Sequence, residues 1–204
     1  MPLVEVELAI AADDPPERAV RLIADARQFI ATYEEESRAS TPAFVPSDFE
    51  LVHRALAAVE SNHLATGRRF IEWGSGVGVV TCLAALVGFD AVGIEIESAL
   101  VKIAQELAET HDIDVQFACG SFVPDGVEPS VDLSGDVNWL STTGSDGYAE
   151  LELEPDDFDL VFAYPWPGEE PVIFDLFADT AAVGTLLLTY HGLEGVRLQR
   201  KVRR

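Results

Sequence analysis

Residues 70–78 read FIEWGSGVG, an apolar stretch that runs directly into glycines at positions 74, 76 and 78. The apolar part predicts a buried strand, and the apolar residues 77–87 predict a helix behind it. Glycines allow the backbone to turn tightly and to approach a ligand closely. This stretch therefore predicts a strand, a ligand-binding turn and a helix in direct succession.

Strands and helices are expected to alternate along the chain after this motif. The apolar pattern predicts strands at 91–96, 115–119, 159–163 and 185–190, and helices at 98–110 and 172–182. Such alternation is typical of βαβ units and a mostly parallel sheet. We therefore expect an α/β protein with a Rossmann-like, doubly wound sheet.

An acidic residue follows the glycine motif at a spacing typical of nucleoside-cofactor sites. Glu95 ends the second expected strand, 21 residues after Gly74, where a carboxylate can accept hydrogen bonds from two ribose hydroxyls. The glycine spacing differs from the G-x-G-x-x-G of dinucleotide enzymes, and no phosphate-binding lysine follows it. Glu72 would repel a pyrophosphate but would suit a cationic amino or sulfonium group. The sequence therefore favours a nucleoside cofactor that carries a positive charge.

These residues resemble the class I S-adenosylmethionine-dependent methyltransferases. The resemblance covers about residues 66–190 and implies S-adenosyl-L-methionine as the cofactor, with a core strand order of 3-2-1-4-5. The matching motifs are E-x-G-x-G-x-G at 72–78, GIE at 93–95, CGSF at 119–122 and FDLVFAYPWPGEE at 158–170. The segment FVPSDF at 44–49 also resembles one that precedes the core in the family's lysine methyltransferases, where it contributes to the cofactor pocket and its lid.

The resemblance implies a role for each matching residue. The glycine loop would hold the methionine part of the cofactor, Glu95 would hold the ribose, and Ser121 and Phe122 would flank the adenine. The expected cofactor-binding residues are Glu72, Trp73, Gly74, Ser75, Gly76, Gly78, Glu95, Ile96, Ser121, Phe122 and Ala163. The expected catalytic residues, which line the methyl-transfer site, are Tyr164, Trp166 and Glu169.

Two departures from the family's pattern concern the site. Ser121 stands where many members have an Asp that accepts from the adenine amino group, and a serine can accept only weakly. The string AYPW at 163–166 lacks the polar acceptor found in members that methylate nucleic-acid amino groups. The second departure argues against a nucleic-acid base as the methyl acceptor.

A third departure concerns the edge of the sheet. Only 14 residues follow Tyr190, too few for the family's two last strands and a helix, so we expect a shortened C-terminal edge. Residues 196–202 would make one antiparallel edge strand. The alternating residues 3–10 predict an N-terminal strand that could cover another edge, and a homodimer is the alternative.

Several candidate residues have a second interpretation. Tyr164 and Trp166 either line the site or pack as aromatic side chains beneath a proline turn. Glu169 and Glu170 either place favourable charge at a helix N-terminus or provide a carboxylate that orients or deprotonates a substrate amine. His191 follows the last expected core strand and is a further candidate base.

Composition limits the classes of partner. The chain has 13 basic and 36 acidic residues, a net charge of −23, and no Lys or Arg between Lys102 and Arg197. A duplex-binding protein needs several basic contacts to phosphates, so nucleic-acid binding is not expected. No apolar run is long enough to span a membrane, and the first ten residues lack the basic residues of a signal peptide. Two cysteines favour the cytoplasm, and no His/Cys cluster predicts a metal.

The sequence divides into two expected parts. Residues 1–66 would form an N-terminal strand and a helical lid, and residues 67–204 the cofactor-binding core, with a loop insertion at about 124–155 that includes an expected hairpin at 148–154. The favoured function is methyl transfer to a protein amine such as lysine, with a basic protein or a small molecule as substrate. The alternatives are a small-molecule methyltransferase and a non-catalytic, cofactor-binding partner subunit, while the glycine spacing disfavours a nucleotide-dependent oxidoreductase.

Overall fold

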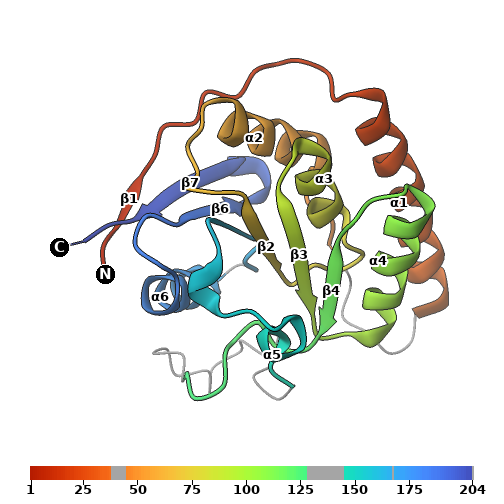
Figure 1. Cartoon of the computed structure of the whole chain (residues 1–204). Helices are drawn as coiled ribbons and strands as arrows, with labels where there is room; N and C mark the ends of the chain where they lie inside the picture. Colours follow the sequence, from red (N-terminus) through yellow and green to blue (C-terminus); the bar gives the residue numbers. More distant parts are fainter. Residues whose placement is uncertain (38–44, 128–144, 167, 204) are drawn as a thin grey trace.

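The computed structural model describes residues 1–37, 45–127, 145–166 and 168–203. Its centre is a seven-stranded sheet in the order β1-β7-β6-β5-β2-β3-β4 (Figure 1). The strands are β1 (Leu3–Glu5), β2 (Arg69–Trp73), β3 (Asp90–Glu95), β4 (Gln116–Cys119), β5 (Leu160–Ala163), β6 (Leu186–Tyr190) and β7 (Val196–Lys201). The run β4-β3-β2-β5-β6 is parallel, which confirms the expected doubly wound α/β sheet and its core order of 3-2-1-4-5.

Alternation along the strands sorts their side chains into two layers. Phe70 and Phe162 face one side of the sheet, and their neighbours Ile71 and Val161 face the other. On the first side lie α1 (Glu17–Ser37), α2 (Phe49–Ser61), α3 (Val79–Val87) and α4 (Ser98–Thr110). On the other side lie α5 (Gly147–Leu151) and α6 (Glu170–Thr180), as Figure 1 shows.

The N-terminal helices belong to the first helical layer. Buried residues of α1 and α2, such as Leu22 and Leu56, share one apolar cluster with α3 and α4. The division of the chain at residue 66, and the lid role of these helices, stay predictions. None of the described helices has the length and apolarity needed to cross a membrane.

The antiparallel strand expected at 196–202 is confirmed as β7, but the sheet is not shortened at this edge, because β1 lies beyond β7. β7 pairs antiparallel with β6, and β1 pairs antiparallel with β7, so that residues from the two ends of the chain lie side by side. The strand expected at 3–10 is paired as a strand only over Leu3–Glu5, and the Val6 N–H adds one more bond to the Leu198 carbonyl. β1 therefore covers β7, so that β1 and not β7 is the edge strand on this side of the sheet.

The hairpin expected at 148–154 is wrong, because the first part of this segment belongs to the helix α5 (Gly147–Leu151). The Asp146 side chain accepts a hydrogen bond from the Tyr148 N–H and caps the helix. Tyr148 is buried against the sheet, where its ring contacts Phe158. The expected insertion at 124–155 is described only in part, since residues 128–144 lie outside the described residues.

Candidate functional site

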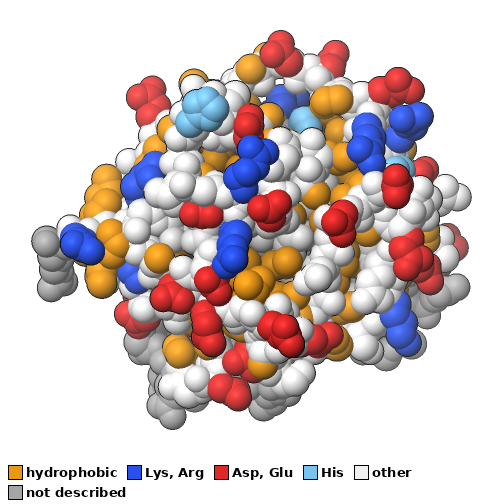
Figure 2. All heavy atoms as spheres, in the orientation of Figure 1, with side chains coloured by type: hydrophobic (Ala, Val, Ile, Leu, Met, Phe, Trp, Pro, Cys, Tyr) orange, Lys and Arg blue, Asp and Glu red, His pale blue; other side chains and the backbone are white. Residues whose placement is uncertain are grey.

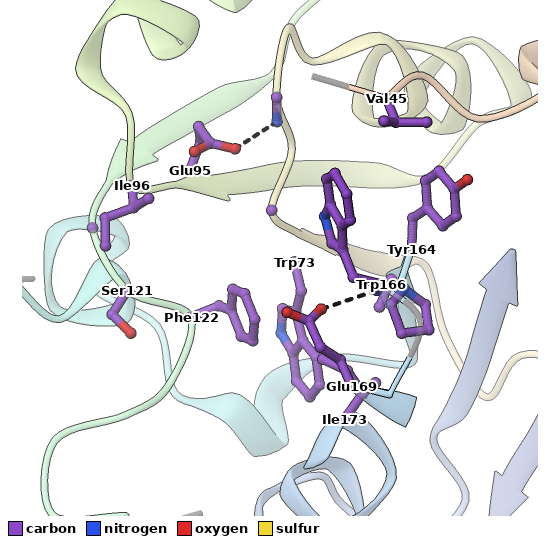
Figure 3. A pocket seen from close by; sticks show the side chains of 15 residues that line it. Val45, Trp73, Glu95, Ile96, Ser121, Phe122, Tyr164, Trp166, Glu169 and Ile173 are labelled. Carbon is purple, nitrogen blue, oxygen red and sulfur yellow. Dashed lines mark hydrogen bonds between the residues drawn. The ribbon is translucent and has the colours of Figure 1, made fainter. Parts of the chain in front are cut away.

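A pocket of about 210 Å³ lies where the carboxyl ends of four parallel strands meet. Segments that follow β2, β3, β4 and β5 form it, and strand order reverses between β2 and β5, the usual place for a ligand in an open α/β sheet. Its lining residues, many of them drawn in Figure 3, are Val45, Trp73, Gly74, Gly76, Glu95, Ile96, Gly120, Ser121, Phe122, Ala163, Tyr164, Pro165, Trp166, Glu169 and Ile173. Eleven of the fourteen expected site residues are thus brought together.

The glycine loop depends on positive φ angles, which residues other than glycine adopt only with backbone strain. Gly74 and Gly78 have φ values of +70° and +75°, in the left-handed region that favours glycine. A side chain at Gly74 would meet no atom within 4 Å, whereas at Gly78 its Cβ would lie 2.5 Å from the Phe117 ring. Gly74 therefore keeps the wall of the pocket open, while Gly78 lets α3 pack closely on the sheet.

Glu95 joins the glycine loop to the end of β3. Its carboxylate is 8% exposed and accepts hydrogen bonds from the N–H groups of Gly76 (2.8 Å) and Glu97 (2.9 Å). Burial raises the pKa of this carboxyl, and the backbone hydrogen bonds oppose the rise. Each carboxylate oxygen has more than one acceptor site, so Glu95 can still accept from two hydroxyls of a ligand.

The expected residues Glu72, Ser75 and Gly78 lie outside this pocket. Glu72 Oε2 accepts hydrogen bonds from the Thr81 N–H (2.8 Å) and hydroxyl (2.6 Å), at the first turn of α3. Burial raises its pKa from the ordinary 4.5 to about 8. Glu72 and the buried Ser75 instead line a neighbouring cavity of about 40 Å³. Their cofactor-binding roles stay predictions.

An aromatic wall closes one side of the pocket. The Trp73 and Phe122 rings are stacked, with centroids 5.4 Å apart and planes at 6°. Trp73 Nε1 donates to the Tyr148 hydroxyl (2.8 Å), and Ser121 Oγ accepts from the Val123 N–H (3.0 Å). These bonds fix the orientation of the wall before any ligand binds.

The segment between β5 and α6 brings the three expected catalytic residues together in a second wall of the pocket. The Tyr164 ring packs edge-on against Tyr190, with centroids 4.8 Å apart, and burial raises the pKa of the Tyr164 hydroxyl. Glu169 Oε2 accepts from the Trp166 N–H (2.9 Å), as Figure 3 shows. Burial also raises the pKa of the Glu169 carboxyl, and this hydrogen bond opposes the rise.

His191 lies outside the residues that line the pocket. Its Nε2 is 2.7 Å from the Thr189 hydroxyl, and its Nδ1 is 3.2 Å from Glu170 Oε1. The ring thus ties the first turn of α6 to the end of β6. This placement favours a structural role over the candidate role as a base.

Sequence reasoning missed three contributors to the site. Ile173 is an ordinary apolar residue with no local signal, and Tyr148 acts only through Trp73. Gly120 could have been found within the CGSF motif, because a Cβ there would lie 2.4 Å from the Ser145 carbonyl oxygen. Segment 44–49 contributes Val45, whereas residue 44 lies outside the described residues.

The electrostatics of the pocket favour a cationic ligand. Its lining residues include two carboxylates, Glu95 and Glu169, and no Lys, Arg or His among the described residues. Such a lining repels phosphates and attracts an ammonium or sulfonium group. Across the same described ranges, no group of three or more His, Cys, Asp or Glu side chains is placed to hold a metal ion.

Comparison by sequence finds short matches to two curated methyltransferases, and no family model matches the chain. The chain is 37% identical over 65 residues to the 23S rRNA (uracil(747)-C(5))-methyltransferase of Pyrococcus abyssi, across 32% of this chain and 15% of that protein. It is 34% identical over 65 residues to the ribosomal protein L11 methyltransferase of Neisseria meningitidis, across 31% and 21%. The chain thus matches about a seventh and about a fifth of the length of these relatives.

Comparison by structure finds similar folds over most of the chain. An RNA methyltransferase from Salinibacter ruber in complex with S-adenosylhomocysteine has a TM-score of 0.51 at 21% identity, covering 77% of this chain and 92% of that one. An O-methyltransferase from Bacillus cereus in complex with the same compound has a TM-score of 0.53 at 16% identity, covering 88% and 68%. The chain has the Rossmann-like fold of the class I S-adenosylmethionine-dependent methyltransferases.

Proposed function

We propose that this chain is a methyltransferase that binds S-adenosylmethionine in the pocket at the carboxyl ends of β2, β3, β4 and β5. The main support is the hydrogen bond from the glycine loop to Glu95, in a pocket lined by carboxylates and aromatic rings. Among the described lining residues, a dinucleotide pyrophosphate would meet two carboxylates and no basic side chain. The fold of the solved methyltransferases supports the same proposal.

The lining residues fit the parts of this cofactor. Glu95 would accept from the ribose hydroxyls, while Ile96 and Phe122 would flank the adenine and Ser121 would lie near its edge. Gly74 leaves room for the methionine part. When bound, S-adenosylmethionine supplies an electrophilic methyl group on a sulfonium. The protein then needs mainly to orient a neutral nucleophile toward that methyl and to exclude water.

We further propose that the methyl acceptor is a protein amine such as a lysine side chain. The net charge of −23 would attract a basic partner. Figure 2 shows Lys and Arg side chains scattered among Asp and Glu side chains, without a broad basic patch on the face it draws. Two of the similar proteins are RNA methyltransferases by name, but this surface suits a polyanion poorly. A small-molecule amine is the alternative acceptor.

We also propose a cytoplasmic location. Cys82 and Cys119, the two cysteines of the chain, are both free thiols. Free thiols are typical of a reducing compartment.

Transfer of radiolabelled methyl groups tests the proposed acceptor. The protein would be incubated with labelled S-adenosylmethionine and, in parallel, with total ribosomal protein, the same protein after lysine acetylation, and total RNA. We expect label in the untreated protein and a strong loss after acetylation. Label in RNA alone, or equal label before and after acetylation, would contradict a lysine acceptor while leaving methyl transfer in place.

A further inference from the structure

Glu169 holds a buried carboxylate oxygen that the protein leaves without a partner. The residue is 5% exposed and lines the pocket. Its Oε2 accepts from the Trp166 N–H, but Oε1 has no hydrogen-bond partner among the described residues. In Figure 3 the carboxylate lies between the Trp166 backbone and the rings of Trp73 and Phe122. Buried polar atoms of native proteins are mostly hydrogen-bonded, so this oxygen calls for an explanation.

Capping of α6 does not explain this carboxylate. Glu169 is the N-cap residue of α6, yet its side chain accepts no hydrogen bond from the first turn of that helix. The carboxylate is instead held by Trp166 and faces the pocket. Of the two interpretations given by the sequence, favourable charge at a helix end thus accounts for Glu169 less well than a contact with a ligand.

The surroundings define what such a ligand must offer. Oε1 needs an N–H or O–H donor, and the described lining residues contain no basic side chain to supply one. Tyr164 and Trp166 lie on the same wall, and aromatic faces attract cations. Glu95, the other carboxylate, already accepts two backbone bonds at the end of β3. An aliphatic ammonium group meets all of these conditions.

We infer that Glu169 Oε1 binds the nitrogen of an aliphatic amine that serves as the methyl acceptor. This inference rests on the proposed function and names the contact that would select its substrate. The amine enters as an ammonium, donates a hydrogen bond to Oε1 and transfers one proton to that oxygen. The nitrogen keeps the electron pair of the broken N–H bond and becomes the neutral nucleophile that methyl transfer requires.

The titratable groups that line the pocket suit this proton transfer. They are Glu95, Tyr164 and Glu169, with no His or Lys among the described lining residues. A general base works best when its pKa lies near the working pH, and burial moves the pKa of Glu169 in that direction. No described hydrogen bond links Glu95 to Glu169, so Glu95 has no described route for exchanging a proton with it.

Binding of two matched probes tests the inference without requiring turnover. The protein would first be saturated with S-adenosylhomocysteine, and Nα-acetyl-lysine methylamide would then be titrated against its norleucine counterpart, which lacks the amine. We expect the wild type to prefer the lysine probe at least about tenfold, as a charge-assisted hydrogen bond implies. Glu169→Gln, which still accepts from the Trp166 N–H, should reduce this preference to about twofold or less.

Glu170→Gln provides the matched control. It makes the same change one residue away, at a half-exposed carboxylate that contacts His191 and does not line the pocket, so it should keep the preference. If Glu169→Gln folds poorly, Glu169→Asp replaces it as the test variant. This change keeps the charge but withdraws the carboxylate by one methylene, and it should also weaken binding of the lysine probe.

The outcomes separate the inference from the proposed function. An unchanged preference in Glu169→Gln, or no preference in a wild type that binds S-adenosylhomocysteine, would overturn the role of Glu169 and leave the methyltransferase proposal standing. A wild type that fails to bind S-adenosylhomocysteine would overturn both.

Discussion

Replacing Glu72 with glutamine should change how stability depends on pH. The Glu72 carboxyl is buried on β2 and bound to the Thr81 N–H and hydroxyl. Burial raises its pKa from 4.5 to about 8, and the bonds from Thr81 only partly oppose this rise. A glutamine carbonyl can accept the same bonds but cannot ionise. The variant therefore removes the ionisation and keeps the local contacts.

The sign and size of the effect follow from proton linkage. The unfolded carboxyl loses its proton near pH 4.5, whereas the folded one keeps it up to about pH 8. Between these values the unfolded state binds fewer protons, so the free energy of unfolding falls as pH rises, and the loss is complete above the folded pKa. At about 1.4 kcal/mol per pH unit, with the slope halved where pH reaches the folded pKa, wild type should lose about 2 kcal/mol relative to Glu72→Gln between pH 6 and pH 8.

Urea denaturation of both proteins at pH 6, 7 and 8 measures this difference. Glu106→Gln, a change at an exposed glutamate of α4, is the matched control and should show no such trend. A difference between wild type and Glu72→Gln that stays constant across this range, to about 0.5 kcal/mol, would refute the reasoning. Glu72 would then be ionised in the folded protein and available to a cationic ligand.

Three further changes test the packing of the fold. Tyr148→Phe leaves the buried Trp73 N–H without its acceptor and should lower the free energy of unfolding by about 1–3 kcal/mol in urea denaturation. Gly78→Ala and Gly126→Ala both place a side chain at positive φ, but only Gly78 faces an aromatic ring of β4. In thermal denaturation, Gly78→Ala should lower the free energy of unfolding by about 1–3 kcal/mol more than Gly126→Ala does. Equal effects would contradict the close packing of α3. Removal of residues 1–5 uncovers β7 and should cause concentration-dependent association in light scattering; a truncated protein that stays monomeric would show that β1 is not needed to protect this edge.

The parts of the fold that local sequence specifies were predicted well. An apolar run that enters a glycine loop requires a strand and a tight turn, and Glu95 follows at the end of β3 as expected. Strands at both ends of the chain were expected, but their pairing with each other was not predictable in this way, because β1 and β7 lie at opposite ends of the chain. Their pairing depends on an exposed β7 edge that no local pattern describes.

The wrong hairpin prediction and the position of Glu72 outside the pocket have equally local causes. YAELELE at 148–154 alternates like a strand, but the Asp146 cap and the burial of Tyr148 favour a helix. Glu72 and Trp73 are adjacent on β2, so their side chains point to opposite faces of the sheet. Trp73 stacks on Phe122 in the pocket wall, whereas Glu72 binds the first turn of α3. The E-x-G-x-G-x-G pattern alone does not state which of them faces the pocket. Strand periodicity, applied to the motif itself, would have separated the two.

The most direct test of the central claim is calorimetric titration with S-adenosylmethionine and S-adenosylhomocysteine. Wild type and Glu97→Ala, whose exposed side chain is not needed for the backbone bond to Glu95, should bind both compounds with similar micromolar affinity. Glu95→Ala, in a protein shown by circular dichroism to be folded, should lose binding by about a hundredfold or more, because two hydroxyl–carboxylate bonds are removed. Absence of binding to wild type at millimolar ligand, or full affinity in Glu95→Ala, would contradict the proposed cofactor site.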